Sequence, residues 1–150
     1  RRVLDEGVGK VIQVGIRTYS LEEKNIIERD ERVETWFARD LIHMDTEKSN
    51  WKELIRQIKN LSGPVWLSFD IDGLDGFLVP ATGTPVPGGL SFWGANEIII
   101  ELFSASNAKI IGADVNEIST SSNTKLTEFS AALIATKIIV GHIISQKDNH

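Results

Sequence analysis

Two aspartates one residue apart carry the clearest chemistry in this 150-residue chain. Asp70 and Asp72 follow an apolar run, 65–69, and precede a stretch rich in proline and glycine, 76–89. Side chains two apart in a strand point to the same side, and two carboxylates aimed together repel unless a cation lies between them. Carboxylate pairs suit Mg²⁺ or Mn²⁺, whereas zinc sites usually recruit nitrogen or sulfur. An Asp-x-Asp pattern also occurs in turns, but its position favours part of a metal site.

The elements that position this pair follow from the hydrophobic pattern. Apolar runs predict strands at 11–16, 65–69 and 109–115, and amphipathic spacing predicts helices at 20–30, 49–61, 92–105 and 126–144. Segment 35–44 is compatible with a helix and a short strand, and the residues before Gly7 or Gly9 with the end of a helix. Gly63 and Pro64 should end the helix before the second strand. This alternation predicts an α/β fold of three layers, with a mainly parallel sheet flanked by helices.

Polar side chains follow each predicted strand, at the end where parallel sheets hold their ligands. They are Arg17, the pair Asp70 and Asp72, and the group Asp114, Asn116 and Glu117. We expect them to converge on one pocket. Glu117 could be a third metal ligand, or it could hold a cationic group such as a guanidinium through paired hydrogen bonds. Segment 76–89 contains three of the four prolines and four of the twelve glycines, which predicts a stiff, non-helical loop beside the site.

Composition narrows the class of partner. The net charge is −5 and the sequence has no long basic run, so it offers no positively charged surface for nucleic acid or an anionic membrane. The expected binding partner is therefore a small molecule. The absence of cysteine excludes disulfides and thiolate chemistry. We expect no signal peptide, no bilayer-spanning segment and a cytoplasmic protein. The acidic run 28–34 is expected to form a solvated face. Four tryptophans are expected to pack in the core or an interface: Trp36, Trp51, Trp66 and Trp93.

Segment 69–74, Phe-Asp-Ile-Asp-Gly-Leu, resembles the first motif of the haloacid dehalogenase-type phosphatases. In that family the first aspartate is a nucleophile, the second is an acid/base, and Mg²⁺ lies between them. The family usually has threonine where this chain has Leu74. A Mg²⁺-dependent phosphatase is therefore an alternative interpretation of the same residues.

A longer resemblance connects the chain with the ureohydrolase family, the arginases and agmatinases. Segments 68–75 and 80–90 resemble a signature of that family, 112–118 resembles its late Asp-x-x-Glu motif, and 1–17 resembles the stretch after its His-Gly-Thr motif. The resemblance is closest to the agmatinase type. It implies that 1–150 is the C-terminal portion of a single arginase-like α/β domain whose N-terminal half is missing. Gly76 and Thr120 depart from the family pattern without removing a ligand.

The resemblance implies a role for four residues. Asp70 would bridge two Mn²⁺ ions, Asp72 would bind one of them, Glu117 would bind the substrate guanidinium and Thr84 would line the pocket. The implied reaction is hydrolysis of a guanidino or amidine C–N bond by a hydroxide that bridges the two Mn²⁺ ions, with release of urea. The implied partners are a small guanidino substrate and further copies of the chain, in a trimer or hexamer.

The family motifs that supply metal-binding histidines and the proton-shuttling histidine do not occur in the sequence. We therefore assign no catalytic residue within the chain, and none of the three histidines matches a family position: His43, His142 and His150. Arginases tend to have an aspartate soon after the position of Arg17, whereas this chain continues with 18–20, Thr-Tyr-Ser, which favours agmatine or a guanidino acid as substrate. A non-catalytic ureohydrolase-like module for binding or oligomerisation is a second alternative.

Overall fold

The computed structural model describes residues 2–42, 49–121 and 123–147. In chain order the elements are α1 (Arg2–Asp5), β1 (Val11–Ile16), α2 (Leu21–Arg29), β2 (Val33–Phe37), the 3₁₀ turn η1 (Ala38–Leu41), α3 (Asn50–Lys59), β3 (Ser62–Asp70), the 3₁₀ turn η2 (Ile71–Gly73), α4 (Phe92–Phe103), β4 (Asn107–Asn116) and α5 (Leu126–Lys147). This order confirms the predicted α/β alternation.

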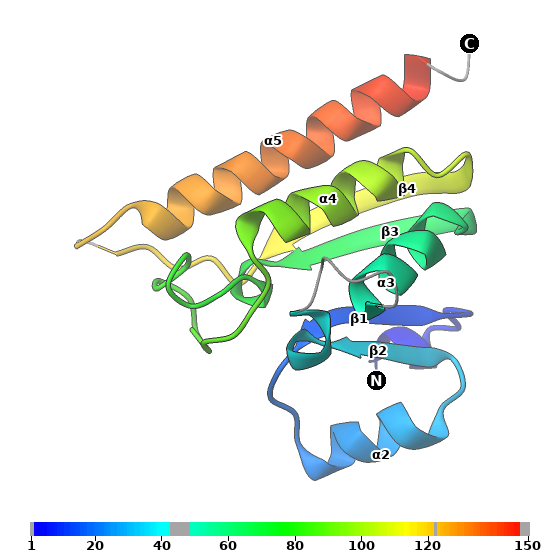
Figure 1. Ribbon diagram of the computed structural model, residues 1–150, viewed down its shortest axis with the longest axis horizontal. Coiled ribbons are helices and arrows are strands. Elements are labelled where there is room, and N and C mark those ends of the chain that lie inside the picture. Colours follow the sequence, from blue (N-terminus) through cyan, green and yellow to red (C-terminus); the bar gives the residue numbers. More distant parts are fainter. Residues whose placement is uncertain (1, 43–48, 122, 148–150) are drawn as a thin grey trace.

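The strands form two parallel pairs. β1 pairs with β2, and β3 pairs with β4, each in parallel register. In the described part of the chain no ladder of hydrogen bonds joins one pair to the other. In Figure 1 the carboxyl ends of β3 and β4 lie beside the loops that carry the predicted site. The predicted parallel, helix-flanked arrangement is confirmed, and it is divided into two sheets.

Local signals explain most of the boundaries. Ser20 caps α2 through a capping box with Glu23, and the Ser49 side chain accepts a hydrogen bond from the Lys52 amide at the start of α3. One prediction was wrong. The helix ends at Lys59, before Gly63 and Pro64, which already belong to β3. Proline is tolerated there because it lies near the start of an edge strand.

The core lies between α3, α4, α5 and one face of the β3–β4 sheet. Leu54, Ile99 and Ile134 are fully buried, one from each helix, and Ile71 and Leu74 join them from the turn after β3. Burial of such a side chain stabilises the fold by about 1.5–3 kcal/mol. The turn that carries Asp72 is thus anchored on the core.

The four tryptophans are not equivalent. Trp51 is buried and its indole N–H donates to the Glu97 carboxylate, and Trp36 is half-buried. Trp66 and Trp93 are 60% and 76% exposed. The prediction of core packing is therefore wrong for Trp66 and Trp93, and packing in an interface stays a prediction for these two.

The composition of α5 differs from a third expectation. By length and composition this 22-residue helix could cross a membrane, although we expected no such segment. Part of its surface is nevertheless packed on the domain, because Ala131, Ile134 and Ile138 are buried. Figure 1 shows α5 running alongside α4 and β4. One side of α5 is therefore a helix face of the core.

Candidate functional site

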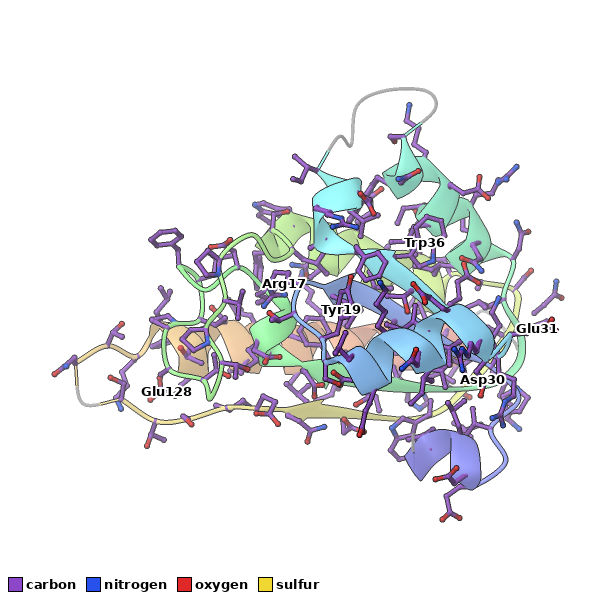
Figure 2. The ribbon with its side chains drawn as sticks, turned by 90° about the horizontal axis from the view of Figure 1, so that it is seen from below. Arg17, Tyr19, Asp30, Glu31, Trp36 and Glu128 are labelled. Atoms are coloured by element: carbon purple, nitrogen blue, oxygen red, sulfur yellow. The ribbon has the colours of Figure 1, made fainter. Side chains whose placement is uncertain are left out.

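Arg17 at the end of β1 connects the two sheets near the predicted site. Its guanidinium donates to the backbone carbonyls of Asp72 (2.5 Å), Gly15 (2.9 Å) and Gly73 (3.5 Å). Figure 2 shows the Arg17 side chain between the end of β1 and the segment that follows β3. Arg17 therefore reaches the site as predicted, but it holds the backbone of the turn that bears Asp72.

Three predicted site residues form what we call the strand-end carboxylates: Asp70, Asp72 and Glu117. Partial burial raises the pKa of Asp70, and the charges of Asp72, Glu117 and Asp114 raise it further. A hydrogen bond with the Asn116 side chain acts in the opposite direction. The predicted convergence at the carboxyl ends of the strands is thus present for these side chains.

Thr84 lies beside a predicted metal ligand. Its hydroxyl donates to Asp72 Oδ2 at 2.7 Å. The hydrogen bond leaves the other carboxylate oxygen of Asp72 available to a further partner. Thr84 therefore orients Asp72, a role that we did not predict from the sequence, where it was expected to line the substrate pocket.

The loop 76–89 is closed by Asp75. The Asp75 carboxylate accepts hydrogen bonds from the backbone N–H groups of Phe77 (3.0 Å) and Gly88 (2.7 Å), at opposite ends of the loop. The Phe77 N–H has the largest effect in lowering the pKa of Asp75. Farther along, the Ala81 N–H donates to the buried Thr127 hydroxyl at 2.9 Å. These contacts explain how the loop holds Thr84 in place.

Glu117 has an unusual backbone. Its φ of 61° makes it the one non-glycine residue with positive φ in the described ranges, a conformation that costs about 1–3 kcal/mol. Its carboxylate lies next to Gly83, where an added Cβ would be 3.7 Å from Oε2. The Ser119 N–H also donates to the Ala81 carbonyl at 3.0 Å. Glu117 is therefore held against the loop that carries Thr84.

Sequence reasoning missed two members of a network near Asp70. Trp66 Nε1 and Ser68 Oγ donate to the Asp114 carboxylate at 2.6 and 2.8 Å, and the Asn116 amide donates to it as well. The signal was available: residues 66, 68 and 70 alternate onto one face of β3. Their pairing with 112, 114 and 116 required the register between the strands.

The donor chemistry fits a divalent cation, but the number of ligands is small. Among the described residues, no group of three or more His, Cys, Asp or Glu side chains could hold a metal ion. The ion pairs found in these same residues leave Asp70, Asp72 and Glu117 without a lysine or arginine partner. His142 is exposed on α5, and His43 and His150 lie outside the described residues. The site therefore provides part of a coordination shell.

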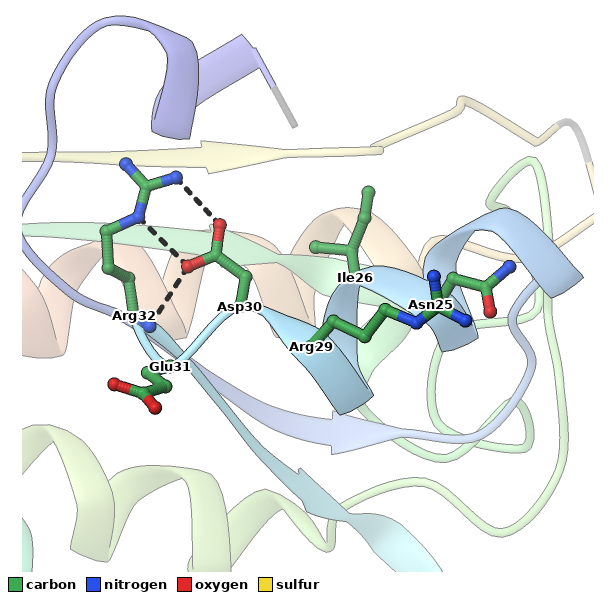
Figure 3. Close-up of a pocket in the computed structure, with 6 residues that line it drawn as sticks. All are labelled: Asn25, Ile26, Arg29, Asp30, Glu31 and Arg32. Carbon is green, nitrogen blue, oxygen red and sulfur yellow. Dashed lines mark hydrogen bonds and ion pairs between the residues drawn. The ribbon is translucent and has the colours of Figure 1, made fainter.

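A hollow lies elsewhere on the molecule. It is lined by Asn25, Ile26 and residues 29–32, at the end of α2 (Figure 3). The Arg32 guanidinium already pairs with the Asp30 carboxylate at 2.7 Å. The hollow shares no residue with the strand-end carboxylates, so we place the candidate site at the strand ends on chemistry rather than on concavity.

Comparison with known proteins gives consistent matches. A model of the arginase family matches residues 1–141. The chain is 31% identical over 140 residues to N(1)-aminopropylagmatine ureohydrolase of Synechocystis, covering 93% of this chain and 42% of that protein. It is 42% identical over 131 residues to the agmatinase of Chromobacterium violaceum, covering 87% and 37%. The crystal structure of agmatine ureohydrolase of Thermoplasma volcanium matches with a TM-score of 0.77 at 28% identity, covering 100% of this chain and 48% of that one. The chain thus spans less than half the length of these relatives.

Proposed function

The chain belongs to the arginase family, and from this premise we propose that it contributes carboxylate ligands for Mn²⁺ and a guanidinium-binding carboxylate to the hydrolysis of a guanidino C–N bond. The observation that carries the proposal is that Asp70, Asp72 and Glu117 lie at or just after the carboxyl ends of two paired parallel strands, at one edge of the sheet, and that no ion pair among the described residues involves them. The family match includes residues 69–74, so it replaces the phosphatase alternative.

Each strand-end carboxylate has a distinct role in this proposal. Bound Mn²⁺ supplies Lewis acidity and lowers the pKa of a coordinated water. Asp70 and Asp72 hold the cation, and the Thr84 hydroxyl fixes one oxygen of Asp72. Glu117 pairs with the guanidinium of the substrate through charge-assisted hydrogen bonds and orients it. The remaining ligands and the proton carrier come from residues outside this chain.

The proposed substrate is a guanidine without an α-amino group, such as agmatine or a guanidino acid. Two of the matched relatives are named for agmatine or an agmatine derivative. After Arg17 the chain continues with 18–20, Thr-Tyr-Ser, and so offers no carboxylate there for an α-amino group. Arg17 itself is engaged by three backbone carbonyls, which leaves it unsuited to hold the carboxylate of an amino acid.

The test is a urea-release assay with Mn²⁺ on the protein as its own cells produce it. We expect turnover of agmatine or 4-guanidinobutyrate above that of arginine, and a loss of at least about 100-fold for Asp70→Asn and Glu117→Gln. Glu34→Gln, a carboxylate far from the site, is the matched control and should retain activity. No urea from any of the three substrates, with an intact mass near 16.6 kDa, would favour the non-catalytic module.

We also propose that the protein assembles into a trimer or hexamer. Several apolar side chains on α5 are exposed and could pack against another copy, including Phe129 at 68% and Ile139 at 60%. Native mass spectrometry measures the assembly directly. A monomer at micromolar concentration would contradict this part of the proposal.

A further inference from the structure

One face of the β3–β4 sheet is left uncovered by the described helices. The other face packs on the core through Val65, Leu67 and Phe69. On the uncovered face the register places Trp66 opposite Gly112, Ser68 opposite Asp114, and Asp70 opposite Asn116. A row of polar groups therefore leads along this face to Asp70.

Asp114 is the centre of that row. Its carboxylate accepts hydrogen bonds from Trp66 Nε1 at 2.6 Å, from Ser68 Oγ at 2.8 Å and from the Asn116 amide. Two of the donors lie on β3 and one on β4. Because an ionised carboxylate has about four acceptor positions, three donors from two strands fix its orientation.

Gly112 makes room for the Trp66 indole. A Cβ at Gly112 would lie 2.3 Å from the nearest atom of the Trp66 ring. The ring thus lies across the glycine and reaches the next residue pair along the sheet, at Asp114. Trp66 is 60% exposed, so the hydrogen bond to Asp114 is its main polar restraint.

Asn116 links Asp114 to Asp70. An asparagine amide has two N–H donors. Asn116 donates to Asp114, and the strand register places it directly opposite Asp70, whose pKa its side chain acts to lower. Asn116 therefore connects Asp114, its hydrogen-bond partner, with Asp70, its neighbour across the strands.

We propose that Asp114 is a positioning residue for the metal site: held by Trp66 and Ser68, it orients Asn116, which in turn orients Asp70 toward the cation. The inference rests on the proposed function, because it takes Asp70 as a Mn²⁺ ligand. Residues of this kind, one hydrogen bond behind a ligand, commonly change metal affinity by about 10–100-fold when they are removed.

A network that only supported the sheet would behave differently. Its loss would lower the stability of the protein without changing the affinity for Mn²⁺. A positioning role changes the affinity itself, at conditions where the variant is fully folded. Metal affinity and folding stability must therefore be measured separately.

The experiment is a Mn²⁺ titration of this chain followed by NMR, because the paramagnetic ion broadens nearby amide signals even when it binds weakly. In the wild type we expect broadening centred on the amides of Asp70 and Asp72. Asp114→Ala and Asn116→Ala should each require about tenfold more Mn²⁺ for the same broadening. Asp114→Asn keeps the shape and one acceptor oxygen, and its Mn²⁺ requirement should lie between those of the wild type and Asp114→Ala. Asn107→Ala, at the other end of β4, is the matched control and should equal the wild type.

Gly112→Ala tests the role of Trp66 while leaving Asp114 and Asn116 in place. We expect the indole N–H signal of Trp66 to shift and the Mn²⁺ requirement to rise by less than in Asp114→Ala. Wild-type Mn²⁺ affinity in folded Asp114→Ala and Asn116→Ala would overturn this inference alone. Absence of localised broadening in the wild type at millimolar Mn²⁺ would overturn the proposed metal role of this chain and the inference with it.

Discussion

Two groups of carboxylates in the molecule differ in the charges that surround them. Near the amino ends of β1 and β2, Asp30 pairs with Arg32 at 2.7 Å and Glu34 pairs with Lys10 at 2.6 Å. We call Asp30 and Glu34 the paired carboxylates. The strand-end carboxylates lie at the carboxyl ends of β3 and β4, where neighbouring charges raise the pKa of Asp70. In Figure 2, Asp30 is well separated from Arg17, which marks the strand-end site.

The pKa values follow this difference. A hydrogen bond with Arg32 lowers the pKa of Asp30. Burial acts to raise the pKa of Glu34, but hydrogen bonds with Lys10 and Gln57 outweigh it and the net shift is downward. The chain thus neutralises carboxylates that support the fold with its own cations. No ion pair among the described residues does the same for the strand-end carboxylates, where we propose that a metal ion binds.

The largest expected effect on stability comes from Arg17, whose guanidinium donates to the backbone of the turn that bears Asp72. Arg17→Met leaves the carbonyls of Gly15, Asp72 and Gly73 without their charged donor, and should lower the free energy of unfolding by about 2–3 kcal/mol. Urea denaturation measures the change. Arg56→Met, which removes an exposed pair with Glu53, is the control and should cost less than about 0.5 kcal/mol. Equal effects of the two substitutions would refute the role of Arg17.

Glu117 separates function from stability within the strand-end group. Glycine accepts a φ of 61° without strain, so Glu117→Gly should be about 1 kcal/mol more stable than Glu117→Ala. Both variants lose the carboxylate and should lose guanidinium binding equally. Thermal denaturation and a guanidine-binding titration check the two parts. Equal stabilities would mean that the backbone strain at Glu117 is absent in solution.

Neutralising one member of each group should change stability in opposite directions. Glu34→Gln weakens the ion pair with Lys10 and should destabilise the protein by about 0.5–1 kcal/mol at pH 7. Asp70→Asn removes a charge that its neighbours repel, and should stabilise the metal-free protein by about 0.5 kcal/mol. Denaturant unfolding of both variants in the presence of a chelator makes the comparison. Changes of the same sign would remove the distinction between the groups.

The smallest expected effect is the pH dependence of these differences. The folded-state pKa of Asp70 is raised, so its contribution to stability is fully present below the unfolded value near 3.9 and is lost as pH rises through the folded value. The pKa of Asp30 is lowered, so its contribution is present above that unfolded value and is lost as pH falls through the folded one. Melting temperatures of Asp70→Asn and Asp30→Asn against the wild type, from pH 2.5 to 7, test both signs. A wild type that gains on Asp70→Asn as pH rises would contradict the first.

Local patterns in the sequence predicted the elements, and they predicted which residues would meet. Ser20 and Ser49 mark helix starts, and strand alternation places polar groups at strand ends. Because the carboxyl ends of parallel strands lie at one edge of a sheet, the sequence alone predicts that Asp70 and Glu117 come together.

The remainder depends on contacts between distant segments. The pairing of Trp66 with Gly112 depends on the register of β3 and β4. The positive φ of Glu117 cannot be predicted from the sequence, because glutamate has no preference for that conformation. The division into two sheets is likewise a property of strand neighbours, which a periodic pattern does not encode. Local propensity predicts none of these features.

We propose above that Asp70 and Asp72 bind a divalent metal ion, and we expect the paired carboxylates to bind none. Crystals of the protein grown with Mn²⁺, measured at the manganese absorption edge, give an anomalous difference map that locates the ion directly. We expect a peak between the carboxylates of Asp70 and Asp72 and no peak at Asp30 or Glu34. A strand-end site without a peak in crystals that hold Mn²⁺ elsewhere would contradict it.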